Sequence, residues 1–162
     1  MQPQPRSSHA AIVVRNKLRL FIWAGLGADS ATIPTASIES FHFFSKEWEQ
    51  PQPLHGSLPD DLWSMAVTSD GESAYTFGGK TGSAYVNTLY KVNPTTLCCA
   101  QLLPTSESHA PKKTRGSGMV HFNEKLVVHG GWNGQENNDE LHVFNLKTSE
   151  CGRRKKCMQS SA

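Results

Sequence analysis

The 162-residue sequence has no long hydrophobic run and few cysteines. Its longest apolar stretch, residues 21–28, is far shorter than the about 20 residues that a membrane-spanning helix needs. The apolar run Ala10–Val14 is too short for a signal-peptide core. Four cysteines, two of them adjacent, do not make a disulfide framework. We therefore expect a reduced, cytoplasmic protein.

The sequence also lacks a strong charge of one sign. It has 16 Lys and Arg against 14 Asp and Glu, a formal +2. Four of the basic residues are Arg153, Arg154, Lys155 and Lys156, so residues 1–152 carry 12 basic and 14 acidic groups, a net −2. A body without a basic field does not suit a nucleic-acid backbone. The basic cluster is either a solvated, disordered end or a nuclear-import signal.

Motifs for metal, nucleotide and catalytic chemistry are missing as well. The seven histidines show no ligand spacing, and the cysteines form no CxxC pair of the kind that holds zinc. The run Gly79-Lys80-Thr81 resembles the end of a P-loop, but the glycine required five positions earlier is Ala74. We therefore expect no metal, no cofactor and no enzymatic activity.

The sequence does contain an internal repeat of about 50 residues. At an offset of 52, the second and third copies share a glycine pair, a leucine, an asparagine and a cysteine: Gly78-Gly79 and Gly130-Gly131, Leu89 and Leu141, Asn93 and Asn145, Cys99 and Cys151. In the first copy, Ala24-Gly25 precedes Gly78-Gly79 by 54 residues, and the segment 41–45 aligns with 89–93 at an offset of 48. Three copies account for nearly the whole chain.

Each copy is rich in short segments of β-branched and aromatic residues, separated by turn residues. These predict strands over 10–14, 18–23, 74–77, 86–92, 119–122, 126–129 and 141–146, with turns at 15–17, 69–72 and 123–124. No window shows a sustained helical stripe of apolar residues. Each copy therefore predicts four strands, with a glycine pair after the second, where the backbone must turn or pack closely.

This pattern resembles the kelch repeat of β-propellers. The resemblance is carried by Phe77-Gly-Gly79 with Asn87-x-Leu89-Tyr90, and by Val128-His-Gly-Gly131 with Asp139-x-Leu141. Trp48 stands where a kelch blade usually has a tryptophan. The linkers 5–9 and 55–59 are similar to those of the kelch substrate receptors of cullin-RING ubiquitin ligases. The resemblance implies an all-β protein of three four-stranded antiparallel blades.

The expected organisation is an N-terminal extension (1–5), blade 1 (6–54), blade 2 (55–104), blade 3 (105–151) and a basic, disordered tail (152–162). The first copy has Ala24-Gly25 in place of two glycines, and the fourth strand of blade 3 is expected to be incomplete after Cys151. A closed propeller has about four to eight blades. We therefore expect an open propeller, either truncated from a longer protein or closed by self-association through its outer blade faces.

The start of the first strand and the end of the second lie at one end of a blade. Residues there are candidates for binding a partner at the channel, because Arg and Trp dominate binding hot spots. We assign partner binding to Arg6, Ser8, Trp63, Lys80, Arg115, Ser117, Trp132 and Asn133, and structural roles to the glycines Gly25, Gly78, Gly79, Gly130 and Gly131. Arg6 and Arg115, placed at matching starts of their blades, predict a peptide with an acidic or C-terminal carboxylate segment.

The leading functional hypothesis is a protein–protein interaction module, serving substrate recognition in a ubiquitin-ligase or scaffold assembly. The alternative is a truncated kelch fragment without independent function, or one that regulates a full-length relative. A galactose-oxidase-like enzyme shares the kelch fold, but the sequence supplies no copper-ligand set, so this third reading is disfavoured.

Overall fold

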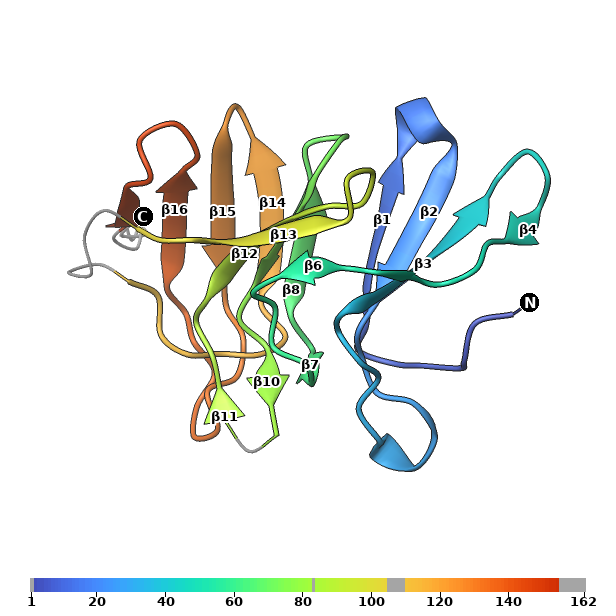
Figure 1. Ribbon diagram of the computed structural model, residues 1–162. Helices are drawn as coiled ribbons and strands as arrows, with labels where there is room; N and C mark the ends of the chain where they lie inside the picture. The colour runs from blue at the N-terminus through green and yellow to red at the C-terminus, as the bar shows by residue number, and fades with distance from the viewer. Residues whose placement is uncertain (1, 83, 105–109, 155–162) are drawn as a thin grey trace, which may run out of the picture.

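The computed structural model describes residues 2–82, 84–104 and 110–154. Within these ranges the secondary structure consists of β-strands and two single 3-10 turns, η1 (Arg15–Lys17) and η2 (Ala28–Ser30), so the predicted all-β kelch fold is confirmed. No helix in the described part is long and apolar enough to cross a membrane. Three sheets follow one another along the chain as blades, and a fourth, small sheet of three short strands accompanies the second blade (Figure 1).

Blade 1 is a five-stranded sheet. Its strands are β1 (Ala10–Val14), β2 (Arg19–Trp23), β3 (Ser37–His42), β4 (Glu47–Trp48) and β5 (Gln52–Pro53). β4 and β5 pair with successive parts of β3, because Pro51 and Pro53 lack the N–H groups of a continuous edge strand. The outer edge of blade 1 is therefore two short strands in place of one.

Blade 2 has the expected four strands and one more. They are β8 (Ala66–Ser69), β9 (Ala74–Phe77), β12 (Leu89–Asn93), β13 (Cys98–Leu102) and the added β6 (His55–Gly56). β6 pairs in parallel with the outer strand β13. The strand expected to begin at Val86 begins at Leu89, since the Val86 N–H and the Thr88 carbonyl bond to the backbone of the glycine pair. The linker from blade 1 thus becomes part of the edge of blade 2.

Blade 3 consists of β14 (Gly118–Phe122), β15 (Lys125–His129), β16 (Leu141–Asn145) and β17 (Cys151–Arg154). β17 pairs with β16 along its whole length, from Cys151 opposite Phe144 to Arg154 opposite Leu141. The fourth strand is therefore present, contrary to the expectation that it fails after Cys151. Of the expected tail, residues 152–154 belong to this strand and 155–162 lie outside the described residues.

The strand register shows which residues of the three copies are equivalent, and it corrects part of the alignment made from the sequence repeat. Trp23 pairs with Ile38 in blade 1, as Phe77 pairs with Leu89 in blade 2. The counterpart of Leu89 is therefore Ile38 at an offset of 51, and the offset of 48 that matched it with Phe41 is wrong. The loop after the first glycine pair is three residues longer than in the other copies, which the sequence alone did not reveal.

The position taken by Trp48 in blade 1 is taken by cysteines in the other blades. Trp48 pairs with Phe41, Cys99 with Val92 and Cys151 with Phe144, so the three residues are equivalent. The ring centres of Trp48 and Phe41 are 5.2 Å apart. Cys99 is buried and its thiol donates to the His55 carbonyl at 3.2 Å.

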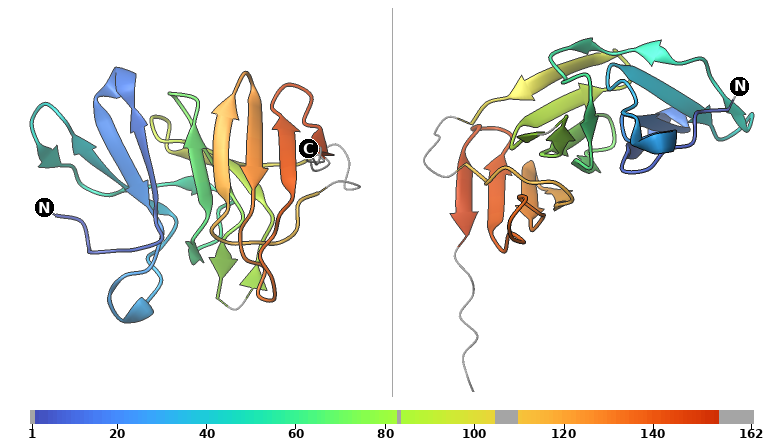
Figure 2. Two further views of the ribbon diagram at one scale, coloured as in Figure 1. Left: turned by 180° about the vertical axis from the view of Figure 1, so that it is seen from behind. Right: turned by 90° about the horizontal axis from the view of Figure 1, so that it is seen from below.

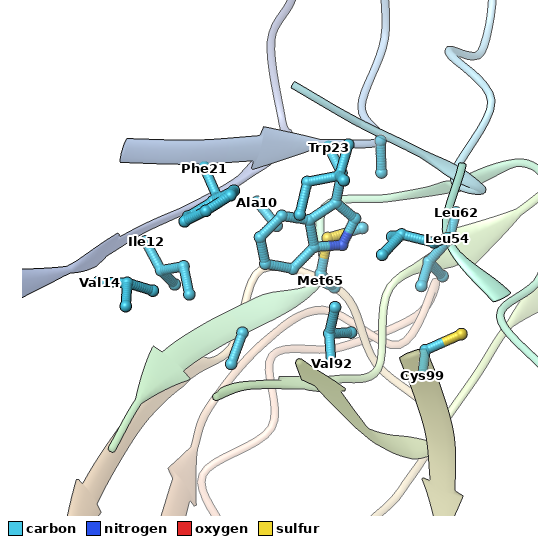
Figure 3. Packing of buried hydrophobic residues seen from close by; sticks show 13 residues of the cluster. Ala10, Ile12, Val14, Phe21, Trp23, Leu54, Leu62, Met65, Val92 and Cys99 are labelled. Carbon is cyan, nitrogen blue, oxygen red and sulfur yellow. The ribbon is translucent and has the colours of Figure 1, made fainter. Parts of the chain in front are cut away.

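The blades stand side by side along an arc, with β8 packed between β1 and β14 (Figure 2). The core lies between the blades. The face of blade 1 made by Ala10, Ile12, Val14, Phe21 and Trp23 packs on Met65, Val92 and Cys99 of blade 2 (Figure 3). A second cluster joins Tyr75, Phe77 and Leu89 of blade 2 to Met119, Leu126 and Phe144 of blade 3. Burial of these faces fixes the order of the blades.

Candidate functional site

The three blades carry equivalent backbone bridges at the end where their glycine pairs lie. These bridges join Ser7 to Leu26, Trp63 to Lys80 and Arg115 to Trp132. We call this end of the arc the rim. In blade 2 the rim is extended by a small sheet of β7 (Leu62–Trp63), β10 (Lys80–Thr81) and β11 (Ala84–Tyr85), at the lower end in Figure 1.

A line of backbone hydrogen bonds links the blades along the rim. The Ser64 N–H donates to the Ser8 carbonyl at 2.9 Å, and the Gly116 N–H donates to the Ser64 carbonyl at 2.8 Å. All three residues have left-handed backbone, with φ of 54° at Ser8, 55° at Ser64 and 66° at Gly116. A serine in this region is under backbone strain. The shared conformation gives the preceding residues Ser7, Trp63 and Arg115 equivalent places on the rim.

The second glycine of each pair allows two segments of the same blade to lie close together here. A Cβ on Gly79 would lie 2.8 Å from the Trp63 carbonyl oxygen, and one on Gly131 would lie 2.2 Å from Thr114 Oγ1. Similar contacts would arise at Gly25, 2.6 Å from the Ser7 carbonyl oxygen. Because a side chain would not fit at these three positions, glycine is required there for the backbone to bring the rim residues into place.

The indole of Trp63 lies beside two cations. The Lys80 ammonium nitrogen is 5.5 Å from the ring centre, and the Arg115 guanidinium carbon is 5.3 Å from it. The same ammonium is 5.7 Å from the Tyr85 ring. Cation–π attraction favours this arrangement and orients both cations. All four side chains are half-buried, so they are held in place and remain accessible to a partner.

The two cations of this cluster have no acidic partner in the part of the chain that the structure describes. Neither Lys80 nor Arg115 lies within 4.0 Å of a carboxylate there, and the buried Nε of Arg115 has no hydrogen-bond partner. Glu136, which follows the rim in blade 3, pairs with Lys112 at 3.4 Å. The cluster of Trp63, Lys80, Tyr85 and Arg115 thus combines unneutralised positive charge with aromatic surface.

Arg6 does not join this cluster. It forms an ion pair with Glu39 on β3, and its side chain is only 4% exposed. It also donates to the Ala24 carbonyl at 3.4 Å. The bridges make Ser7, not Arg6, the counterpart of Arg115, so the expected match between the two arginines is wrong. The cause is local: one residue of shift moves the side chain from the rim into blade 1.

The other residues expected at the site lie close to the rim, several with local structural contacts. Trp132 is half-buried beside Arg115, and Ser8 is exposed. Ser117 donates its hydroxyl to the Gly130 carbonyl at 3.0 Å. The Asn133 side-chain oxygen accepts from the Gln135 and Glu136 N–H groups and closes a turn. Partner binding by these residues stays a prediction.

Tyr85 is the rim residue that sequence reasoning missed. It reaches Lys80 because β10 and β11 form a hairpin directly after the second glycine pair. Its ring also lies 3.0 Å from the place of a Cβ on Gly134, in the corresponding loop of blade 3. An aromatic residue a few positions after a glycine pair was the available signal.

The geometry of the described residues also bears on metal binding and on disulfides. In residues 2–82, 84–104 and 110–154, no group of three or more His, Cys, Asp or Glu side chains is placed to hold a metal ion. The structure describes three cysteines, none of them disulfide-bonded. What the rim offers is a charged, aromatic surface.

Comparison with known proteins adds family information. The family model described as the KLHDC2/KLHL20/DRC7 Kelch-repeats domain matches residues 1–157. The chain is 27% identical over 150 residues to the leucine-zipper-like transcriptional regulator 1 homolog of Drosophila melanogaster, covering 90% of the chain and 15% of that protein. It is 24% identical over 149 residues to Kelch domain-containing protein 10 of Rattus norvegicus, covering 90% of the chain and 36% of that protein.

A shorter match concerns a probable serine/threonine-protein kinase of Dictyostelium discoideum, 27% identical over 84 residues. It covers 52% of the chain and 6% of the kinase. The chain thus spans 36% or less of the length of these three relatives.

Proposed function

The chain belongs to the kelch-repeat family, whose domains are generally protein–protein interaction modules, and we propose that it binds an acidic segment of another protein at its rim. The observation that carries the proposal is the placement of Lys80 and Arg115 on the Trp63 ring without a carboxylate partner in the described chain. We assign no catalytic role to this surface.

The chemistry of the cluster selects a carboxylate. A guanidinium donates two parallel hydrogen bonds to a carboxylate, and an ammonium adds a second positive charge at short range. Trp63 and Tyr85 supply rigid apolar area that excludes water around those bonds, which strengthens them. A peptide with an Asp, Glu or C-terminal carboxylate next to an apolar residue therefore fits the surface. Trp132 extends the apolar area on the blade 3 side.

Nucleic acid is the weaker match for this charge. Residues 1–154, which include all the blade strands, carry 14 basic and 14 acidic groups, a net charge of zero, so the two rim cations do not sit in a basic field. Binding to a phosphate backbone depends on many contacts spread over a basic field. The two cations beside the Trp63 ring are better matched to one carboxylate of a peptide than to a row of phosphates.

The experiment is a selection of random peptides displayed with free C-termini on the 162-residue protein, followed by affinity measurements on the peptides recovered. We expect the recovered peptides to share a carboxylate next to an apolar residue. Arg115→Ala should weaken their binding by about 10- to 100-fold, since a charge-assisted hydrogen bond is worth about 1.5–3 kcal/mol.

Lys147→Ala is the matched control. Lys147 pairs with Glu124 at 2.7 Å on exposed turns of blade 3, and its change removes one positive charge away from the cluster. The control should bind as the parent does. Equal binding by the parent and Arg115→Ala, or recovery of peptides without a shared carboxylate, would place the site elsewhere.

We further propose that the recognised segment belongs to a protein delivered to a larger assembly, as in the cullin-RING substrate receptors that the linker spacing resembles. Support for this role is the sequence resemblance of the segments 5–9 and 55–59. Co-precipitation from cells expressing the chain, scored for cullin subunits, tests it. Recovery of the segment-bearing protein without any cullin would refute the ligase role and leave the binding role intact.

A further inference from the structure

The two ends of the arc expose the faces that are buried between its blades. We call the face of each blade that packs on the next blade its leading face, and the face that packs on the preceding blade its trailing face. Blade 3 has no described blade on its leading face, and blade 1 has none on its trailing face (Figure 2). Within the chain, a leading face always packs on a trailing face, so the two open faces are of the kinds that pack together.

Equivalent positions show the difference directly on the leading faces. Ile12 and Val14 of blade 1 are 6% and 1% exposed, because blade 2 covers them. The strand register makes Val120 and Phe122 their counterparts in blade 3, and these are 57% and 67% exposed. Val127 and Val143 lie in the same cross-strand row as Val120 and extend the apolar face across the sheet.

The trailing faces show the same contrast at two positions, although Ile22 of blade 1 is as buried as its counterpart Val128, both 7% exposed. Leu126 and Phe144 of blade 3 are 0% and 7% exposed where they meet blade 2. Their counterparts in blade 1 are Leu20 and Phe41, both only half-buried. Val13 on β1 is 43% exposed on this face. Glu39, the acid on this face, forms an ion pair with Arg6.

We propose that two copies of this chain close into a six-bladed ring, with the leading face of blade 3 in each copy packed on the trailing face of blade 1 in the other. Six blades lie within the range of about four to eight that closed propellers use. The two contacts repeat the blade-to-blade packing found twice within the chain. A second copy is therefore a complementary occupant for both open faces at once.

The arrangement is a head-to-tail contact that closes after two copies. Head-to-tail contacts give a ring when the rotation closes and an open filament when it does not. Closure after two copies requires each blade to turn by about one sixth of a circle on its neighbour, so that the outer contacts repeat the internal ones. The ring would bring two copies of the rim cluster around one channel, independently of what that cluster binds.

The internal interface also tells which residues meet. His121 on the trailing face of blade 3 stacks on Tyr75 on the leading face of blade 2, with ring centres 6.1 Å apart. The strand register makes Val13 the counterpart of His121, and Val127 the counterpart of Tyr75. Val13 of one copy should therefore face Val127 of the other.

Sedimentation velocity on the 162-residue protein at tens of micromolar tests the proposal. We expect one species with twice the 17.8 kDa mass of one chain. Val13→Glu and Val127→Lys should each raise the dimer dissociation constant by at least about tenfold, because each places an unpaired charge in an apolar contact. An equimolar mixture of these two variants should recover the dimer, because the introduced carboxylate and ammonium then face each other in one contact while the other is parental.

Phe44→Glu is the control, since Phe44 is 85% exposed in the turn between β3 and β4, outside both open faces. It should sediment as the parent does, and circular dichroism should show that all variants stay folded. A monomeric parent, open-ended larger assemblies, single variants that dimerise normally, or a mixture that stays monomeric would each overturn the ring. A dimer broken by Val13→Glu and unaffected by Val127→Lys would indicate a symmetric contact of blade 1 and would also overturn it.

Discussion

At the residue scale, blade 1 has Ala24-Gly25 where the other two blades have two glycines, a difference of one methyl group. Ala24 has φ of 61°, close to the 65° of Gly78 and 76° of Gly130, so it adopts a conformation that alanine disfavours. The next blade-to-blade hydrogen bond is longer in this copy, 3.3 Å from Gly25 to Leu62 against 2.8 Å from Gly79 to Thr114. Blade 1 therefore tolerates the methyl group through a slightly wider spacing.

The same position should respond differently in the second blade. A Cβ on Gly78 would lie 2.5 Å from the Thr114 carbonyl oxygen. We expect Gly78→Ala to lower the free energy of unfolding by about 2–4 kcal/mol, from left-handed strain and this clash together. Ala24→Gly should change it by less than about 1 kcal/mol, since relief of strain offsets a lost buried methyl and added chain entropy. Urea denaturation of both variants measures the contrast, and equal losses would contradict it.

The residues of the rim show how far sequence reasoning reaches. Trp63, Lys80, Arg115 and Trp132 could be placed together from the repeat, because each occurs at a fixed distance from a glycine pair. Arg6 could not be placed correctly, since its partner Glu39 lies 33 residues away and only folding reveals the pair. Tyr85 was missed because the strands on either side of Gly82-Ser83 are only two residues long, too short to show the apolar alternation that predicts a hairpin.

At the scale of elements, the outer edge of blade 1 is fastened by a charge cluster across three segments. Arg19 on β2 donates two hydrogen bonds from Nε and one from an η nitrogen to Glu49, which follows β4, and Ser40 on β3 donates to the same carboxylate. These bonds lower the pKa of Glu49 to about 2, with the Arg19 bond the main cause. They hold in place an edge that its prolines leave poorly paired.

This cluster should make blade 1 sensitive to acid. A carboxylate whose folded pKa is lowered stabilises the protein fully above its unfolded pKa and loses that contribution as the pH falls toward 2. We expect Glu49→Gln to cost about 1 kcal/mol at pH 7, a figure limited by the 31% and 40% exposure of the two side chains. The difference from the parent should vanish as the pH approaches 2.

Denaturation by urea at several values between pH 3 and pH 7 checks this expectation. Glu47→Gln is the matched control, since Glu47 is exposed on the adjacent strand and forms no ion pair within the described residues. A Glu49→Gln difference that stays constant across this range would show that the cluster contributes no charge-dependent stability.

The elements themselves could be predicted well where the signal is local. The strands over 10–14 and 74–77 have the predicted bounds, and the turn at 123–124 has two residues with positive φ. β6 was not foreseen because it pairs with β13, which is distant in the sequence. The full length of β17 was not foreseen because its residues show no apolar alternation. Gly152 and the arginines after it carry no strand signal of their own; β16 supplies the partner.

At the scale of the whole molecule, the arc carries two kinds of surface for which we propose binding partners. The rim presents Trp63, Lys80 and Arg115 for an acidic segment, and the open blade faces present apolar residues for another blade. The first depends on the charge of two side chains, and the second on burial of apolar area. The two can be tested separately, because Val13 and Val127 lie on blade faces and the three rim residues lie at the glycine pairs.

Recognition of a carboxylate by Arg115 can be measured by a double-mutant cycle. The four affinities are those of the parent and Arg115→Ala for a selected peptide and for the same peptide with its carboxylate converted to an amide. We predict a coupling of about 1.5–3 kcal/mol, with Arg115→Ala weakening the acid peptide by about 10- to 100-fold and the amide peptide hardly at all. Equal losses for the two peptides, or no loss for either, would show that Arg115 does not recognise the carboxylate.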